Sequence, residues 1–304
     1  MIKVKRQIEA PKTLSKFRRV PAFERFWYGP RRLMSNAIAA AVQMESGADL
    51  ELNLERARAL TRRAAEAGAT LVVLPEVFAW RGTRADESAH LSPIPGRVSD
   101  FLRELAADLG VTIVGGSFLE RSERDGMSYN TSLLVDRTGA IRAAYRKIHL
   151  FDVDLPGQVT VRESDARIPG TDVVTAATDL GTIGLSICYD LRFPELYRRL
   201  VRADATIVTV PAAFTAYTGA AHWEPLLRAR AIENQVYVIA PNQSGKSPHG
   251  FPDYGHSMIV DPWGTVVAHA AGEGEAVVTA EIDAALLARV RREMPCLGHA
   301  RLPS

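Results

Sequence analysis

The chain has 304 residues, of which 47% are hydrophobic and 24% are charged, a composition typical of a globular protein with one large core. Charge is unevenly distributed: residues 1–32 contain ten Lys and Arg against two Glu, whereas the remainder contains 27 against 33, a net charge of −6. The acidic body argues against a nucleic-acid-binding surface. No apolar run approaches the roughly 18 residues that cross a bilayer, which argues against a membrane protein.

Residues 1–35 are rich in Lys, Arg and Pro and have no clear hydrophobic periodicity, which predicts a poorly ordered basic N-terminal extension. They contain no continuous apolar segment, which argues against a secretory signal. We expect Met34 to be the natural start, because the first predicted strand follows at once. A basic organelle-targeting peptide is the alternative, and the two glutamates of the segment count against it.

From residue 37 onwards, predicted strands and helices alternate. The predicted strands are 37–44, 70–74, 111–115, 131–135, 141–145, 181–187, 205–210 and 236–240, two near residues 258 and 267, and 276–282. The predicted helices are about 50–67, 99–109, one from residue 194, about 222–234, and 284–292. A polar loop of about 25 residues follows residue 149, and loops of this length are usually functional. The alternation predicts one α/β domain over residues 36–304.

Three polar residues follow predicted strands: Glu76, Lys147 and Cys188. Each also has a structural explanation, namely a cap or surface ion pair for the carboxylate, a solvated strand end for the lysine, and a small buried hydrophobe for the cysteine. Together they make chemical sense. A thiol needs a base to become a nucleophile, a carboxylate can be that base, and an ammonium can stabilise an oxyanion.

Three segments carry a family resemblance: LVVLPEVF around Glu76, YRKIHLFDVDLPG around Lys147 and ICYDLRFPEL around Cys188. In this order they resemble the nitrilase, or carbon–nitrogen hydrolase, superfamily, and the match runs from about residue 37 to 301. The resemblance implies a four-layer αββα sandwich with these three residues as the catalytic set. It also implies supporting roles for Glu163, which precedes a Pro-Gly pair, and for the backbone N–H of Tyr189 at the oxyanion. It implies no cofactor.

Four segments, DLRFPEL, HLFDVDLPG, TGAAHWEPLLRARAIENQVYV and YGHSMIVDPWGTVVA, are similar to the Nit amidases, which are the omega-amidases and the deaminated-glutathione amidases. This similarity implies a thiol amidohydrolase that cleaves a small carboxylate-bearing ω-amide to acid and ammonia through a cysteine thioester. The alternatives are an N-carbamoyl amino acid hydrolase or a nitrilase. A non-catalytic binding protein is disfavoured by the intact Glu–Lys–Cys set.

A carboxylate on the substrate calls for a cationic partner, and a guanidinium suits it best. Arg192 is the candidate because it lies four residues after Cys188, in a position typical of Nit proteins. Its alternative is an ion pair with Asp190 or Glu195 that shapes the turn. Phe214 and Thr215 are predicted to form another wall of the pocket.

His149 could be the base of a Cys–His dyad, but the resemblance makes it a supporting group. The histidines include no HExxH pair and the cysteines no CxxC pair, so no metal site is predicted. Two distant cysteines fit a reducing compartment, so we expect a cytoplasmic protein, with Cys296 as a bystander. The predicted partners are an amide substrate and water, and the resemblance implies a homodimer or a larger homo-oligomer.

Overall fold

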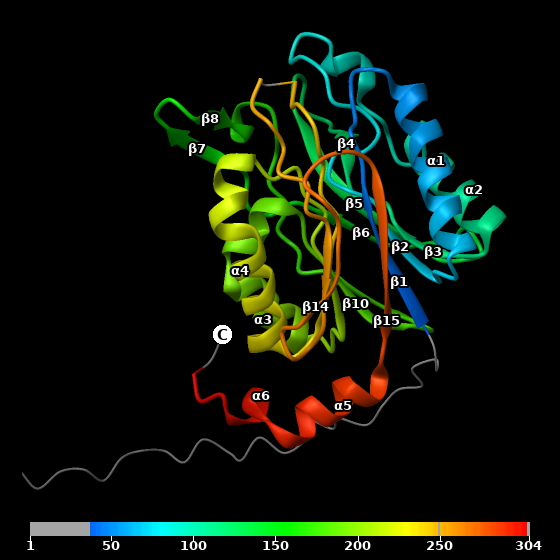
Figure 1. Ribbon diagram of the computed structural model, residues 1–304. Helices are drawn as coiled ribbons and strands as arrows, with labels where there is room; N and C mark the ends of the chain where they lie inside the picture. The colour runs from blue at the N-terminus through cyan, green and yellow to red at the C-terminus, as the bar shows by residue number, and fades with distance from the viewer. Residues whose placement is uncertain (1–36, 249, 303–304) are drawn as a thin grey trace, which may run out of the picture.

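Two β-sheets lie face to face, and each is covered on its outer side by a pair of helices (Figure 1). The computed structural model describes residues 37–248 and 250–302. The predicted basic extension, residues 1–35, lies outside the described residues. Among the described residues, no helix is both long enough and apolar enough to span a membrane.

The first sheet has β1, β2 and β3 side by side and parallel, with antiparallel strands on either side of them. Its strands, in spatial order, are β15 (Ala276–Ile282), β1 (Ala37–Gln43), β2 (Leu71–Val73), β3 (Thr112–Val114), β5 (Ser128–Val135) and β4 (Phe118–Arg121), with β6 (Ile141–Arg146) also paired to β5. Helices α1 (Leu50–Glu66) and α2 (Arg97–Leu109) pack on its outer face.

The second sheet is built in the same way, with β10, β11 and β12 parallel at its centre. Its spatial order is β14 (Val266–His269), β13 (Met258–Val260), β12 (Tyr237–Ala240), β11 (Ile207–Thr209), β10 (Gly181–Leu185) and β9 (Thr175–Thr178). Helices α3 (Pro194–Arg202) and α4 (Ala216–Asn234) cover it, and α5 (Ala284–Glu293) and α6 (Cys296–His299) follow β15. The layer order is therefore the predicted αββα sandwich.

The apolar residues of β1 show why the sheets stack. Ala39 and Ala41 belong to the core between the two sheets, whereas Ala40 and Val42 face α1 and α2. A strand that is covered on both faces needs apolar residues at consecutive positions, because its side chains alternate between the faces. The unbroken apolar run of β1 meets that need.

Two hairpin turns share the same hydrogen-bonding pattern. In each turn an aspartate side chain accepts two backbone N–H bonds, Asp136 from Thr138 and Ala140, and Asp261 from Trp263 and Thr265. Each turn ends in a glycine with positive φ, which the left-handed conformation favours. The two Asp-x-x-Gly hairpins lie at equivalent places in the two sheets.

Two predicted boundaries are wrong. The strand that leads to Cys188 ends at Leu185, because the Asp190 carboxylate accepts the N–H of Ile187 and caps a 3₁₀ turn. The helix expected from about residue 222 begins at Ala216, after the capping residue Thr215.

The long polar loop is also more ordered than predicted. It contains a two-stranded hairpin, β7 (Asp152–Leu155) and β8 (Val159–Arg162), which turns at Pro156 and Gly157. Gly157 has a φ of 74°, a value that glycine adopts without strain. The hairpin places the segment that follows it, with Glu163, at the mouth of the site described next.

Candidate active site

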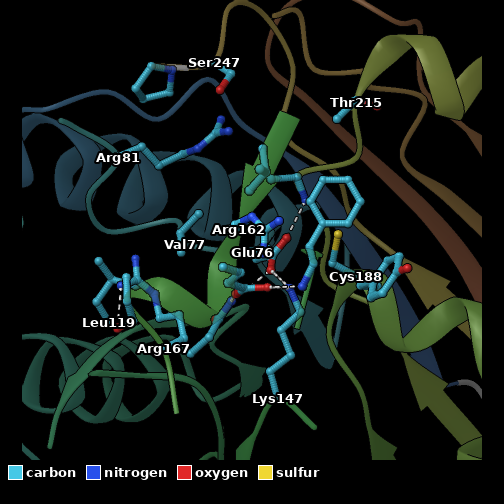
Figure 2. Close-up of a pocket in the computed structure, with 18 of the residues that line it drawn as sticks. Glu76, Val77, Arg81, Leu119, Lys147, Arg162, Arg167, Cys188, Thr215 and Ser247 are labelled. Carbon is cyan, nitrogen blue, oxygen red and sulfur yellow. Dashed lines mark hydrogen bonds and ion pairs between the residues drawn. The ribbon is translucent and has the colours of Figure 1, made fainter. Parts of the chain in front are cut away.

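The predicted site residues meet around one cavity of about 410 Å³ (Figure 2). Its walls come from the loop after β2, the start of the segment after β6, the hairpin β7–β8, the turn after β10 and the loop before α4. The predicted residues that border it are Glu76, Lys147, Glu163, Cys188, Tyr189, Arg192, Phe214 and Thr215.

Glu76 is held by its backbone and by both carboxylate oxygens. Its carbonyl accepts a hydrogen bond from Gln243 Nε2 at 2.9 Å, and the next residue, Val77, has a positive φ of 47°. Its Oε2 accepts the Ala213 N–H at 2.9 Å, and its Oε1 lies 3.0 Å from Lys147 Nζ. Because the side chain is only 5% exposed, these partners replace the water that the carboxylate would otherwise bind.

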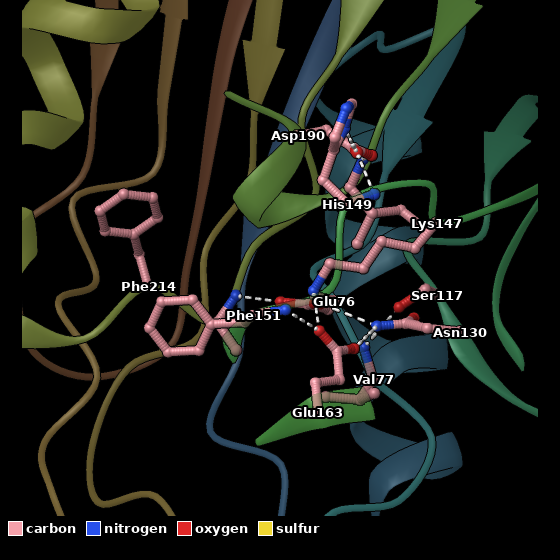
Figure 3. A network of polar contacts seen from close by, with 12 residues as sticks. Glu76, Val77, Ser117, Asn130, Lys147, His149, Phe151, Glu163, Asp190 and Phe214 are labelled. Carbon is pink, nitrogen blue, oxygen red and sulfur yellow. Dashed lines mark hydrogen bonds and ion pairs between the residues drawn. The ribbon is translucent and has the colours of Figure 1, made fainter. Parts of the chain in front are cut away.

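Lys147 joins two carboxylates. Its Nζ lies 3.0 Å from Glu76 Oε1 and 2.8 Å from Glu163 Oε2, and the residue is 2% exposed (Figure 3). Burial alone would lower the pKa of Lys147, but the charges of Glu163 and Glu76 outweigh it and hold the pKa well above its usual value. The side chain is therefore an ammonium.

Glu163 reaches the site from the short 3₁₀ helix Glu163–Asp165, which follows β8. Its Oε2 accepts the N–H of Phe151 at 2.7 Å as well as the bond from Lys147. Two donors of the segment after β6 thus fix one carboxylate oxygen, so the ion pair with Lys147 has a defined geometry.

Cys188 begins the 3₁₀ turn Cys188–Arg192 with a φ of 47°. Positive φ is costly for a residue with a side chain and persists where the surroundings enforce it. Here the Cys188 N–H donates to the carbonyl of Pro211 at 2.8 Å, and the thiol faces the Glu76 carboxylate. Burial, with the negative charge of Glu76, raises the pKa of the Cys188 thiol well above its usual value.

The resting charges follow from these contacts. Burial would raise the pKa of Glu76, but Lys147 and the hydrogen bonds from Cys188 and the Ala213 N–H outweigh it, so the pKa is lowered. Glu76 is thus a carboxylate beside a neutral thiol, and with Lys147 and Glu163 the set carries a net charge of −1. A proton that moves from the thiol to Glu76 leaves that net charge unchanged.

Tyr189 follows Cys188 in the turn, so its N–H lies at the N-terminus of a short helix, where donors lack helical partners. Its ring packs edge-on against Phe151 and Phe193, with ring centroids 5.1 and 5.4 Å apart. These contacts hold the turn against the lysine segment.

Arg192 is placed by aromatic rings and a histidine. Its guanidinium carbon lies 5.2 Å from the Phe214 ring centroid and 5.7 Å from that of Tyr189, and its Nη1 lies 3.2 Å from His222 Nδ1. It forms no ion pair with Asp190 or Glu195, all three being described residues, so the alternative explanation of Arg192 is wrong.

Phe214 and Thr215 border the cavity as predicted, and both also have structural partners. The Phe214 ring packs on Trp223 at 5.1 Å between centroids. The Thr215 hydroxyl caps α4 through the Thr218 N–H and is 3% exposed. Thr215 thus has a capping role that the sequence interpretation did not include.

His149 does not contact Cys188. Its Nδ1 lies 2.7 Å from Asp190 Oδ1, and its ring stacks on Phe193 with centroids 3.7 Å apart. Because both contacts turn the ring away from the thiol, the structure does not support the Cys–His dyad.

Two contributors were missed from the sequence: the Ala213 N–H, which binds Glu76, and Asn130, whose Nδ2 donates to Glu76 Oε1 and Glu163 Oε1 at 2.9 and 3.3 Å. A backbone N–H has no sequence signal, and a single Asn inside a strand has little. Within the residues that the structure describes, no cluster of three or more His, Cys, Asp or Glu side chains is arranged to hold a metal ion.

Comparison with known proteins places this geometry in a family. The family model described as carbon-nitrogen hydrolase matches residues 38–292. Deaminated glutathione amidase from Bos taurus is 44% identical over 269 residues, 87% of this chain and 82% of that protein. Among solved structures, the Caenorhabditis elegans NitFhit protein has a TM-score of 0.81 at 38% identity and is matched over 88% of this chain but 66% of its own.

Saccharomyces cerevisiae Nit3, a member of branch 10 of the nitrilase superfamily, has a TM-score of 0.79 at 33% identity, with 88% of this chain and 97% of that chain covered. The fold, the family match and these relatives agree. The chain belongs to the carbon–nitrogen hydrolase family and is a hydrolase of carbon–nitrogen bonds other than peptide bonds.

Proposed function

We propose that the chain is a thiol amidase that cleaves a small carboxylate-bearing ω-amide through a cysteine thioester. One observation carries the proposal: the Glu76 carboxylate is paired with the Lys147 ammonium at 3.0 Å and faces the Cys188 thiol. This places a base beside the nucleophile and a cation beside the base. Curated relatives from Bos taurus, at 44% identity, to Dictyostelium discoideum, at 39%, carry the name deaminated glutathione amidase, which supports an amide substrate.

In the acylation step, the Cys188 sulfur attacks the amide carbon while its proton passes to Glu76. The carbonyl oxygen becomes an oxyanion, which the Lys147 ammonium and the Tyr189 N–H stabilise. The carbon–nitrogen bond then breaks, and Glu76 returns the proton to the departing nitrogen. Ammonia leaves from a primary amide and an amine from a substituted one, and the acyl group stays on sulfur.

In the deacylation step, water attacks the thioester carbon and gives a proton to Glu76. The carbon–sulfur bond breaks and the sulfur takes that proton back, which restores the resting charges. Glu163 positions Lys147 through their 2.8 Å ion pair and so keeps the ammonium in place through both steps. Each step moves one proton to or from Glu76, which Lys147 already holds at 3.0 Å, so little reorganisation of the base is needed.

The acyl-side carboxylate of the substrate binds Arg192. This residue shares the turn with Cys188, borders the cavity, and is held over the Phe214 and Tyr189 rings. A guanidinium oriented in this way can bind a carboxylate in a bidentate manner.

The leaving-group side of the cavity is also lined by arginines. Figure 2 shows Arg81 and Arg167 on the side away from Cys188. Arg81 is paired with the buried Asp253, and Arg167 with Glu87. Arg162 is exposed, borders the cavity and lies opposite Asp152 in the β7–β8 hairpin, with which it interacts electrostatically. We propose that it also binds a carboxylate on the departing amine, which favours a deaminated peptide over a primary amide.

A substrate panel tests the proposal. The panel compares a primary ω-amide, an N-substituted ω-amide, an N-carbamoyl amino acid and a nitrile, all with a terminal carboxylate, and scores the acid product. Cys188→Ala should abolish turnover of the amides and the acyl adduct seen by intact-protein mass spectrometry. Cys296→Ala, a change at the exposed second cysteine, should preserve both. Faster cleavage of the carbamoyl substrate or the nitrile would contradict the amidase assignment.

The same proposal extends to assembly and location. Ile232 and Trp263 are 48% and 58% exposed and belong to neighbouring surface elements, because the Arg228 side chain of α4 bonds to Gly264 in the turn. Exposed apolar side chains that gather on one face mark interaction surfaces, and we propose a homodimer there. Light scattering should show a dimer that Trp263→Asp weakens.

Two free thiols support a reducing, cytoplasmic location, which cell fractionation checks.

A further inference from the structure

Asn130 contacts three charged members of the proposed catalytic set. Its Nδ2 lies 2.9 Å from Glu76 Oε1 and 3.3 Å from Glu163 Oε1, and its backbone carbonyl accepts the N–H of Lys147 at 2.9 Å (Figure 3). It lies on the central part of β5, borders the cavity and is 2% exposed.

We propose that Asn130 is a positioning residue that holds the Glu76 and Glu163 carboxylates on either side of the lysine. An amide NH₂ group has two N–H bonds, one for each carboxylate. Glu76 and Glu163 repel each other, and one ammonium offsets only one of the two negative charges. The neutral donors of Asn130 add a second bridge between the carboxylates without adding charge.

The bonding of the other end of the side chain argues against a purely structural role. Asn130 Oδ1 is buried and has no hydrogen-bond partner among the described residues. An unpaired buried acceptor lowers stability, and Asn is disfavoured within strands. An apolar residue would serve the strand better, so the retained NH₂ group points to a task at the carboxylates.

The expected consequence is a pH effect on the base. A hydrogen bond donated to a carboxylate favours its ionised form and so lowers its pKa. The groups that face Glu76 are Lys147, Cys188, Asn130, the Ala213 N–H and, across Lys147, the Glu163 carboxylate. Loss of the Asn130 donors therefore lets Glu76 take up a proton at higher pH, and the thiol loses its base there.

The test uses Asn130→Leu in a Cys296→Ala background, where Cys188 is the only remaining cysteine of the chain. The reaction of Cys188 with iodoacetamide is followed as a function of pH, together with kcat and KM on the amide. The acid limb is the part of the pH profile in which the alkylation rate falls as the pH is lowered. We expect its midpoint to rise by about one pH unit. We expect kcat to fall by roughly 10- to 100-fold, the cost of a misplaced catalytic group, and KM to stay within about threefold.

Asn234→Leu is the matched control. Asn234 is also buried, with an unpartnered Oδ1 and an Nδ2 that donates to the Arg230 carbonyl at 3.0 Å, and it does not border the cavity. It should lose stability without moving the acid limb. If Asn130→Leu does not fold, Asn130→Ser keeps one donor and should give an intermediate shift.

The inference rests on the proposed roles of Glu76 and Cys188, but alkylation requires no amide substrate. A wrong substrate class would therefore leave the alkylation result intact. An unchanged acid limb and an unchanged kcat in a folded Asn130 variant would overturn the positioning role. A shift of the same size in Asn234→Leu would overturn it as well.

Discussion

The carboxylate of Asp190 accepts a hydrogen bond from the ring of His149, with 2.7 Å between Oδ1 and Nδ1. Asp190 lies two residues after Cys188, and His149 lies two residues after Lys147. The same carboxylate also accepts the Tyr145 hydroxyl at 2.6 Å and the Ile187 N–H at 2.8 Å. A fully buried acid outside the cavity therefore joins the segment of the nucleophile to the segment of the ammonium.

Replacing that acid should loosen both segments. In Asp190→Asn, one carboxylate oxygen becomes an NH₂ group that faces donors, so buried donors lose their acceptor. We expect the unfolding free energy to fall by about 1–3 kcal/mol, measured by urea denaturation, and kcat to fall with it. Asp125→Asn, a change at an exposed aspartate in a turn, should leave both unchanged. Equal effects in the two variants would contradict the joining role.

The strongly patterned parts of the fold were predictable from the sequence. Helix α1 has an aspartate cap at Asp49 and an apolar face, and α2 ends at Gly110 with a left-handed backbone. The strands β4 and β9 were missed because each is a short edge strand of four residues. Their pairing depends on neighbours that are distant in the sequence, so local pattern gives little signal.

The start of α4 was missed for a different reason. The segment after Thr215 contains Gly219, and glycine is a poor helix former. The structure requires glycine there, because a Cβ atom at this position would lie 2.3 Å from the Tyr254 ring. A tertiary contact therefore selected a residue that local propensity counts against a helix.

The reactive side chains of the site were predictable from the sequence. Glu76, Lys147 and Cys188 follow strands and match known segments, and the structure brings them into contact. The roles of Asn130 and of the Ala213 N–H depend on the pairing of β5 and on a loop that approaches from the second sheet. Such contacts appear only once the two sheets are packed.

The base is the subject of the second prediction. Glu76→Gln keeps the shape of the side chain and removes its ability to accept the thiol proton. We expect kcat/KM to fall by roughly 10²- to 10⁴-fold, the usual contribution of a general base, measured on the amide at neutral pH. Glu224→Gln removes only a surface ion pair with Arg228 and should keep the wild-type value. A loss below tenfold in Glu76→Gln would contradict the assigned role.

The third prediction distinguishes the role of Arg192 from that of Arg162. For an amide with an acyl-side carboxylate, Arg192→Ala should lower kcat/KM. The loss should correspond to about 1.5–3 kcal/mol of transition-state stabilisation, the usual contribution of a charge-assisted hydrogen bond. A neutral amide of the same length should be affected far less. Arg162→Ala should instead lower kcat/KM mainly for amides whose departing amine carries a carboxylate. Equal losses on charged and neutral substrates would mean that Arg192 only shapes the turn.

The last prediction concerns stability at high pH. The usual pKa of a cysteine thiol is 9.0, and burial with the charge of Glu76 raises that of Cys188 well above this value in the folded protein. A raised folded-state pKa stabilises the fold fully below the unfolded value, and this stabilisation is lost as pH rises above it. Above pH 9, the unfolded chain releases the thiol proton while the folded chain keeps it. The unfolding free energy should therefore fall by about 1.4 kcal/mol per pH unit from this group.

Cys188→Ala isolates the effect, because the other groups that titrate in this range are present in both proteins. Tyr145, Tyr197 and Tyr237 also have raised pKa values, so both proteins lose stability in alkali. The difference between the two should nevertheless change by about 1.4 kcal/mol between pH 8 and pH 10, measured by urea denaturation in a Cys296→Ala background. A constant offset over this range would show that the folded protein ionises the thiol as readily as the unfolded chain. Burial and the charge of Glu76 would then not hold the proton on Cys188.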